Sequence, residues 1–224
     1  MTDKIINFYT LLDNKHKQKL PSNYKNHFIK PCSRIGLIGA SGTGKTNSLL
    51  NFMCRSSGDF TKIIICCFST TNEPLYKMIK EKNPQIEFID DPLDIPDLDE
   101  FDDKHKEKNK LIVFDDFIHL GKKQMEPIVK YFIASRKYGF TTIAISQNFS
   151  SLPKVISRNI NYYMLFRIND NISLSHIIRT HNISNISKEE LNKIYREITA
   201  IPFNFLLIDL DNLSIRKNFL EFLN

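Results

Sequence analysis

The chain has 224 residues, of which 42% are hydrophobic and 11% aromatic, and its formal net charge is +6. One α/β domain runs to about 200–250 residues, so the length fits a single domain. The composition excludes collagen-like, coiled-coil and wholly disordered chains. The apolar runs fall far short of the ~20 residues that span a bilayer. No signal-peptide core is visible at the start, so we expect a soluble intracellular protein with no membrane partner.

The charge is distributed unevenly along the sequence. Residues 87–107 contain ten acidic residues and two lysines, a net charge of −8, which leaves +14 on the rest of the chain. We expect the acidic stretch to be an exposed connection between strands. A basic body of this size suits a polyanion partner, although a solvated surface on a lysine-rich protein would give the same excess.

Four cysteines, Cys32, Cys54, Cys66 and Cys67, lack a CxxC spacing and a neighbouring histidine cluster. Structural zinc sites need such spacing, so we interpret the four as reduced, buried thiols.

Apolar runs and helical patterns alternate from residue 34 onward. Residues 1–30 are polar and are interpreted as an N-terminal arm, followed by a domain over 31–224. The predicted strands are 34–39, 62–68, 86–90, 111–114, 141–146 and 162–168, and residues 205–217 predict a hairpin with a two-residue turn at Asp211 and Asn212. The predicted helices are 45–56, 73–83, 123–138, 152–159, 172–179 and 187–198. This order predicts an α/β fold with a parallel sheet, helices on both faces, a C-terminal β-hairpin and chemistry at the carboxyl ends of the strands.

The segment GASGTGKT at residues 39–46 matches the phosphate-binding pattern G-x-x-x-x-G-K-[ST]. Its glycines let backbone N–H groups surround phosphate oxygens, the Lys45 ammonium reaches the β- and γ-phosphates, and the Thr46 hydroxyl can bind Mg²⁺. An apolar strand precedes the segment and a helical pattern follows it, as the motif requires. The expected nucleotide-binding residues are Gly39, Ala40, Ser41, Gly42, Thr43, Gly44, Lys45, Thr46 and Asn47.

Two acidic residues follow the predicted strand in LIVFDD, residues 111–116. In a phosphate-binding-loop enzyme, a carboxylate at this position holds Mg²⁺, which we assign to Asp115. The next carboxylate can orient or deprotonate the attacking water, which we assign to Asp116. The pair favours ATP hydrolysis over transfer to a small acceptor, although Asp116 is shorter than the glutamate more usual there.

Three further residues are candidates for hydrolysis. Gln147 follows the predicted strand 141–146 and can sense the γ-phosphate and the water, or it can simply cap a turn. Arg136 precedes that strand and could reach a neighbouring subunit's site to stabilise transition-state charge. A solvated arginine at a helix end is the plainer interpretation, and Arg158 is a second candidate for the same role.

GASGTGKT, LIVFDD and SRKYGFTTIAISQ, in this order, resemble the FtsK/HerA superfamily of DNA-pumping ATPases. The match looks closest to the genome-packaging ATPases of poxvirus-like large DNA viruses and virophages, which STTNEPLY at 69–76 also resembles. The resemblance covers about residues 30–210. Its most specific part is the R-K-x-G-x(6)-S-Q block that ends at Gln147.

The resemblance implies a RecA-like ATPase core that uses ATP and Mg²⁺ in a hexameric or pentameric ring around double-stranded DNA. It implies that Lys45 and Thr46 hold the nucleotide, Asp115 and Asp116 form the hydrolytic pair, Gln147 is the sensor and Arg136 the trans-acting arginine. It also implies a capsid or portal partner, and a location in the host cytoplasm, in a viral factory or in the virion. The chain departs from many relatives at Asp116, where they have glutamate, and it lacks the DNA-orienting domain of bacterial pumps.

Three functions therefore stand as hypotheses. The first is a packaging ATPase whose duplex contacts are independent of sequence, with Lys154 and Arg158 as candidate DNA-binding residues. The second is a helicase-loader or plasmid-mobilisation ATPase, which would prefer single strands or a protein partner. The third is a nucleotide-gated assembly protein with little turnover, which the shorter Asp116 keeps open.

Overall fold

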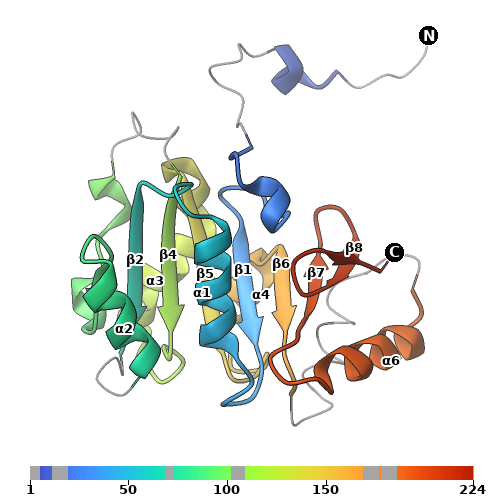
Figure 1. Cartoon of the computed structure of the whole chain (residues 1–224). Helices are drawn as coiled ribbons and strands as arrows, with labels where there is room; N and C mark the ends of the chain where they lie inside the picture. The colour runs from blue at the N-terminus through green and yellow to red at the C-terminus, as the bar shows by residue number, and fades with distance from the viewer. Residues whose placement is uncertain are drawn as a thin grey trace.

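The computed structural model describes residues 6–11, 20–68, 73–101, 109–168, 177 and 186–223. Within them lies one sheet of nine strands in the order β3-β2-β4-β5-β1-β6-β7-β8-β9 (Figure 1). The strands are β1 (Arg34–Ile38), β2 (Lys62–Cys67), β3 (Glu87–Ile89), β4 (Lys110–Asp115), β5 (Phe140–Ser146), β6 (Tyr162–Leu165), β7 (Leu206–Asp209), β8 (Ser214–Lys217) and β9 (Glu221–Phe222). The first six in the chain pair in parallel, and β7, β8 and β9 are antiparallel. The expected α/β fold with a parallel sheet and antiparallel C-terminal strands is confirmed.

Helices cover both faces of the sheet, which explains why its central strands are almost uninterrupted apolar runs. The helices are α1 (Lys45–Arg55), α2 (Pro74–Lys82), α3 (Lys122–Ala134), α4 (Lys154–Asn159) and α6 (Lys188–Thr199). One face packs against α1 and α2 through residues such as Leu49, Phe52 and Ile79. The other packs against α3, α4 and α6 through residues such as Phe132 and Ile156. No helix in the described ranges is long and apolar enough to span a membrane.

Two predicted elements differ from the structure. The helix predicted over 123–138 ends at Ala134 and continues as the 3-10 helix η8 (Ser135–Tyr138), so Arg136 lies on the tighter turn. The hairpin turn spans residues 210–213 rather than two residues, because β7 and β8 pair at Asp209 and Ser214. Asp209 Oδ1 accepts hydrogen bonds from Asp211 N and Asn212 N, both at 3.0 Å, and this fixes the longer turn. The predicted helix 172–179 falls outside the described residues except for Ile177.

The start of the acidic stretch has its own structure. Two 3-10 helices, η5 (Pro92–Asp94) and η6 (Leu98–Glu100), follow β3, and Ile95 and Leu98 are buried in the core. Lys130 Nζ of α3 lies 2.6 Å from Asp97 Oδ1 and 3.1 Å from Asp99 Oδ2. These contacts hold the described part of the stretch beside α3, although sequence alone predicted a plain connection.

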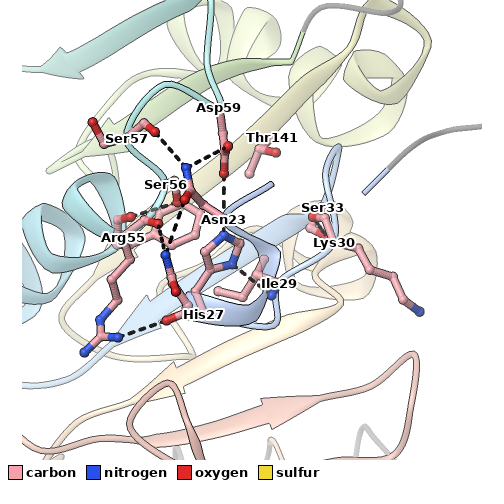
Figure 2. Close-up of polar contacts among 12 residues, drawn as sticks. Asn23, His27, Ile29, Lys30, Ser33, Arg55, Ser56, Ser57, Asp59 and Thr141 are labelled. Carbon is pink, nitrogen blue, oxygen red and sulfur yellow. Dashed lines mark hydrogen bonds and ion pairs between the residues drawn. The ribbon is translucent and has the colours of Figure 1, made fainter. Parts of the chain in front are cut away.

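Residues 20–33 lie against the body of the domain through polar contacts that Figure 2 shows. Asn23 Nδ2 donates to Ser57 O at 2.8 Å and to Asp59 Oδ1 at 3.2 Å, beyond the end of α1. Arg216, which is fully buried in β8, donates through Nη1 to His27 O at 2.9 Å. These contacts join this segment to α1 and to β8.

The cysteines depart from the prediction at one position. Cys32, Cys66 and Cys67 are buried free thiols, whereas Cys54 is exposed on α1. No group of three or more potential metal-ligating side chains is present in the described ranges.

Candidate nucleotide-binding site

The loop between β1 and α1 has the backbone conformation that the glycines permit. Gly42 has φ +73° and Gly44, the residue before α1, has φ +100°, in the left-handed region that favours glycine. Gly39 N donates to Ser146 O at 3.2 Å and Ala40 N donates to Arg167 O at 2.9 Å. The loop is therefore fixed to the ends of its two neighbouring strands, with the positive end of the α1 dipole at its centre.

Lys45 bends back over this loop. Its Nζ donates to Gly39 O at 2.7 Å and to Ala40 O at 2.9 Å. Burial lowers the pKa of Lys45, and the negative charge of Asp115 opposes that shift. The ammonium thus lies at the point where an anion on the loop amides would meet it.

The acidic pair, Asp115 and Asp116, lies at the carboxyl end of β4. Asp115 ends β4 and is paired in register with Cys67 of β2 and Ile145 of β5. Tyr76 Oη donates to Asp115 Oδ2 at 2.7 Å. Burial raises the pKa of the Asp115 carboxyl, while the Tyr76 hydrogen bond and the Lys45 charge both act to lower it.

Asp116 adopts a left-handed backbone conformation, with φ +56°, and is exposed. Aspartate tolerates this region better than most residues. Gln147 follows β5 directly and is also exposed. Because β1, β4 and β5 are parallel and adjacent, their carboxyl ends bring the loop, Asp116 and Gln147 to one edge of the sheet.

These residues surround a cavity of about 340 Å³. Of the predicted nucleotide-binding residues, Ser41, Gly42, Gly44, Lys45, Thr46 and Asn47 line it, together with Asp115, Asp116 and Gln147. Gly39, Ala40 and Thr43 form the loop beneath. The carboxylate of Asp115 and the hydroxyl of Thr46 are hard oxygen ligands, and Mg²⁺ is usually held by one or two carboxylates plus substrate phosphates. The donor set therefore fits Mg²⁺.

The cavity is also lined by residues for which the sequence analysis predicted no role, among them Glu73, Tyr76 and Phe203. Glu73 and Tyr76 follow β2, one of the strands whose carboxyl end was expected to lie near the chemistry. That signal could have identified them. Phe203 comes from the loop between α6 and β7, and no local pattern connects it with the phosphate-binding loop.

The candidate arginines lie away from this cavity. Arg136 precedes β5 and Arg158 precedes β6, so both are near the amino end of the sheet, whereas the loop follows the carboxyl end of β1. Both are exposed, as is Lys154 at the start of α4. Arg136 lies close enough to Arg34 that its charge, after burial, lowers the pKa of Arg34. Within this chain, the structure does not bring these bases to the site.

A phosphate-binding loop after β1, with acidic residues at the end of β4 and β5 between these two strands, defines a P-loop NTPase fold. The sequence matches the model of the Zot family, zonular occludens toxin, over residues 37–211, and the chain belongs to that family. No curated protein matches the sequence.

Several solved structures are similar in fold. The genome-packaging NTPase B204 of Sulfolobus turreted icosahedral virus 2, in complex with sulfate, has a TM-score of 0.61 and 18% identity, covering 85% of this chain and 97% of that one. The same NTPase in complex with AMPPCP has a TM-score of 0.60 and 18% identity, covering 83% and 96%. The conjugation coupling protein TcpA of pCW3, with ATPγS, has a TM-score of 0.51 and 13% identity, covering 80% and 57%. At these identities the similarity establishes the fold.

Proposed function

We propose that the protein is a Mg²⁺-dependent ATPase of the FtsK/HerA type that assembles into a ring and drives double-stranded viral DNA into a capsid. The proposal rests above all on one observation. Lys45, Asp115, Asp116 and Gln147 meet in a single cavity at the carboxyl ends of β1, β4 and β5. The similarity in fold to the B204 packaging NTPase supports the choice among P-loop functions.

The predicted site residues in the cavity have the following roles in this proposal. The loop amides and Lys45 bind the phosphates, and Lys45 exchanges its bonds to Gly39 O and Ala40 O for phosphate oxygens. Thr46 and Asp115 would hold Mg²⁺, which neutralises charge on the β- and γ-phosphates. Asp116 accepts the proton of a water that attacks the γ-phosphorus as the bond to ADP breaks, and Gln147 orients that water.

The remaining requirement is a positive charge for the transition state. Arg136 is exposed, lies at the opposite edge of the sheet from its own phosphate-binding loop, and has Arg34 nearby. A neighbouring subunit in a ring is therefore the natural recipient of its guanidinium. Arg158 shares the edge and the exposure, so it is the alternative donor. The DNA contacts are assigned to exposed bases, including Lys154.

Mixing two inactive variants tests both hydrolysis and the ring. Lys45→Ala removes the phosphate ligand, and Arg136→Ala removes a charge whose counterparts contribute about 10³–10⁵ in rate. Alone, each variant should lack ATP hydrolysis at a concentration where wild type assembles. Mixed, they should recover turnover, because an intact site then meets an intact arginine from its neighbour. Arg158→Ala is tested in parallel. If the mixture hydrolyses ATP no faster than the two variants measured separately and added, for both Arg136→Ala and Arg158→Ala, neither arginine acts in a neighbouring subunit's site.

The fold similarity to the TcpA coupling protein favours one alternative, a plasmid-mobilisation ATPase. Such a protein would have the same nucleotide site but a different nucleic-acid preference. Hydrolysis that responds to single-stranded DNA more strongly than to duplex DNA would favour it over the packaging function.

A further inference from the structure

Phe203 is an unusual residue in the loop between α6 and β7. Its side chain is 60% exposed, although it is large and apolar. Its φ is +67°, a strained region that bulky residues rarely adopt. An exposed aromatic ring on a strained backbone contributes little to the stability of the fold, so its position needs another explanation.

The loop is built to hold this conformation. Asn218, beyond β8, accepts a hydrogen bond from Phe205 N at 3.1 Å through Oδ1 and donates to Asn204 Oδ1 at 3.0 Å through Nδ2. Asn204 N donates to Ile201 O at 3.2 Å. The side chain of Asn218, from the segment after β8, thus fixes the residues on the C-terminal side of Phe203.

Phe203 lies directly on the phosphate-binding loop. A methyl group in place of a hydrogen on Gly44 would lie 2.7 Å from Phe203 Cδ1 and 3.3 Å from its Cα. Gly44 is the residue before α1, at the end of the phosphate-binding loop. The aromatic ring therefore lies beside the last residue of the phosphate-binding loop.

Phe203 also lines two cavities. The first, of about 340 Å³, contains Lys45 and the acidic pair. The second, of about 190 Å³, is lined by Thr43, Arg167 and Pro202 among others. Gly42 and Phe203 line both. A path from the first cavity to the second therefore runs past these two residues.

We propose that Phe203 is a stacking platform for the nucleobase and that the second cavity receives the base. This inference rests on the proposed function, because it requires a nucleoside triphosphate on the phosphate-binding loop. The exposed ring supplies a flat π-face, and stacking on an aromatic side chain is favourable for every base. Packing against Gly44 and the brace from Asn218 set the ring in place before the ligand binds.

Binding of AMPPCP and of inorganic tripolyphosphate, both with Mg²⁺, separates base contacts from phosphate contacts. Phe203→Ala should raise the Kd of AMPPCP by about 5- to 100-fold, the range for loss of one stacked base. The Kd of tripolyphosphate should stay within about twofold, because the phosphate ligands are unchanged. Phe8→Ala is the matched control, because it removes another exposed phenylalanine that is distant from Phe203 in the sequence. It should change the Kd of neither ligand.

Two more variants protect the test against misfolding. Phe203→Gly removes the ring and suits the positive φ, so it should melt no lower than Phe203→Ala while binding AMPPCP as weakly. The chain contains no tryptophan, so Phe203→Trp introduces a single fluorophore at the platform. Its emission should change with AMPPCP and not with tripolyphosphate, whereas Phe8→Trp should respond to neither.

The outcomes distinguish a failure of the stacking platform from a failure of the nucleotide site. Wild type that binds neither ligand would refute the nucleotide site, and the platform with it. Wild type that binds both ligands, with Phe203→Ala weakening both equally or neither, would overturn the platform and leave the nucleotide site standing. A Phe203→Trp emission that ignores AMPPCP, although the variant binds it, would also overturn the platform.

Discussion

At the scale of single residues, the Tyr76 hydroxyl is a specific support for the site. It is buried and donates to Asp115 Oδ2 at 2.7 Å, and burial raises the pKa of Tyr76, so the hydroxyl keeps the proton that it donates. A hydrogen bond to a charged group contributes about 1.5–3 kcal/mol. The orientation of the Asp115 carboxylate therefore depends on a residue from the helix after β2.

Replacing this tyrosine tests that dependence. Tyr76→Phe should lower kcat/KM for Mg-ATP by about tenfold, because the carboxylate loses a charge-assisted hydrogen bond while the packing of the ring is kept. Steady-state hydrolysis over a range of Mg²⁺ concentrations is the measurement. Tyr138→Phe is the control, since Tyr138 makes a similar 2.8 Å bond to Asp99 on the surface. Equal activities of wild type and Tyr76→Phe would show that Asp115 needs no such support.

The site residues that the sequence could predict are those with local signals. The glycine and lysine pattern at 39–46 and the two aspartates after an apolar strand are contiguous in the chain, and both lie at the cavity. Tyr76 follows a predicted strand, but its hydrogen bond to Asp115 depends on the fold. Phe203 has no sequence signal, because its contact with Gly44 joins two elements that are distant in the chain.

At the scale of elements, the segment at residues 20–33 is attached to the domain through a buried histidine (Figure 2). His27 Nδ1 accepts a hydrogen bond from Ile29 N at 3.0 Å, and Nε2 lies 3.9 Å from Asp59 Oδ2. Burial, followed by the charges of Arg216 and Arg55, lowers the pKa of His27 to about 4. The imidazole is therefore neutral in the folded protein at pH values where an exposed histidine would gain a proton.

This difference makes stability depend on pH in a defined direction. Between pH 6.5 and about 4 the unfolded chain binds a proton at His27 and the folded protein does not. The free energy of unfolding therefore falls as the pH falls. Each tenfold difference in proton affinity between the two states corresponds to about 1.4 kcal/mol, so the loss of stability reaches about 3 kcal/mol at most. Urea unfolding of wild type and His27→Asn at pH 4.5 and pH 7 measures it.

His27→Asn keeps an acceptor for Ile29 N and removes the ionisable ring. The variant should be less stable overall, but its stability should fall less between pH 7 and pH 4.5. The pKa of Asp59 is raised by burial, a contribution of opposite sign that both proteins share. His119→Asn, at an exposed position, controls for the loss of a histidine. Identical pH dependence in wild type and His27→Asn would contradict the assignment.

The elements themselves were largely predictable because hydrophobic periodicity is a local signal. The strand and helix order followed from it, whereas the boundaries that differ depend on hydrogen bonds within the turns. α3 ends at Ala134 because the chain continues there as a 3-10 helix. The four-residue turn before β8 is set by hydrogen bonds to the Asp209 side chain. β9 was also missed, since a two-residue strand at the sheet edge leaves no pattern in the sequence.

At the scale of the whole molecule, the two edges of the sheet have different roles in the proposal. The carboxyl edge holds the phosphate-binding loop, Asp116 and Gln147, while the amino edge presents Arg136 and Arg158 to solvent. A ring in which one subunit's amino edge meets its neighbour's cavity would complete each site. The chain's charge of +14 outside residues 87–107 favours a polyanion in contact with such a ring.

A ring that moves duplex DNA, as we propose, should couple its ATP turnover to the presence of that DNA. ATP hydrolysis is followed with and without long duplex DNA, at low and high salt, for wild type, Lys45→Ala and Asp116→Asn. Duplex DNA should stimulate the wild type, high salt should weaken that stimulation because phosphate contacts release counterions, and both variants should lose turnover. Wild-type turnover that is indifferent to duplex DNA, or absent while ATP still binds, would contradict the proposed DNA-pumping function.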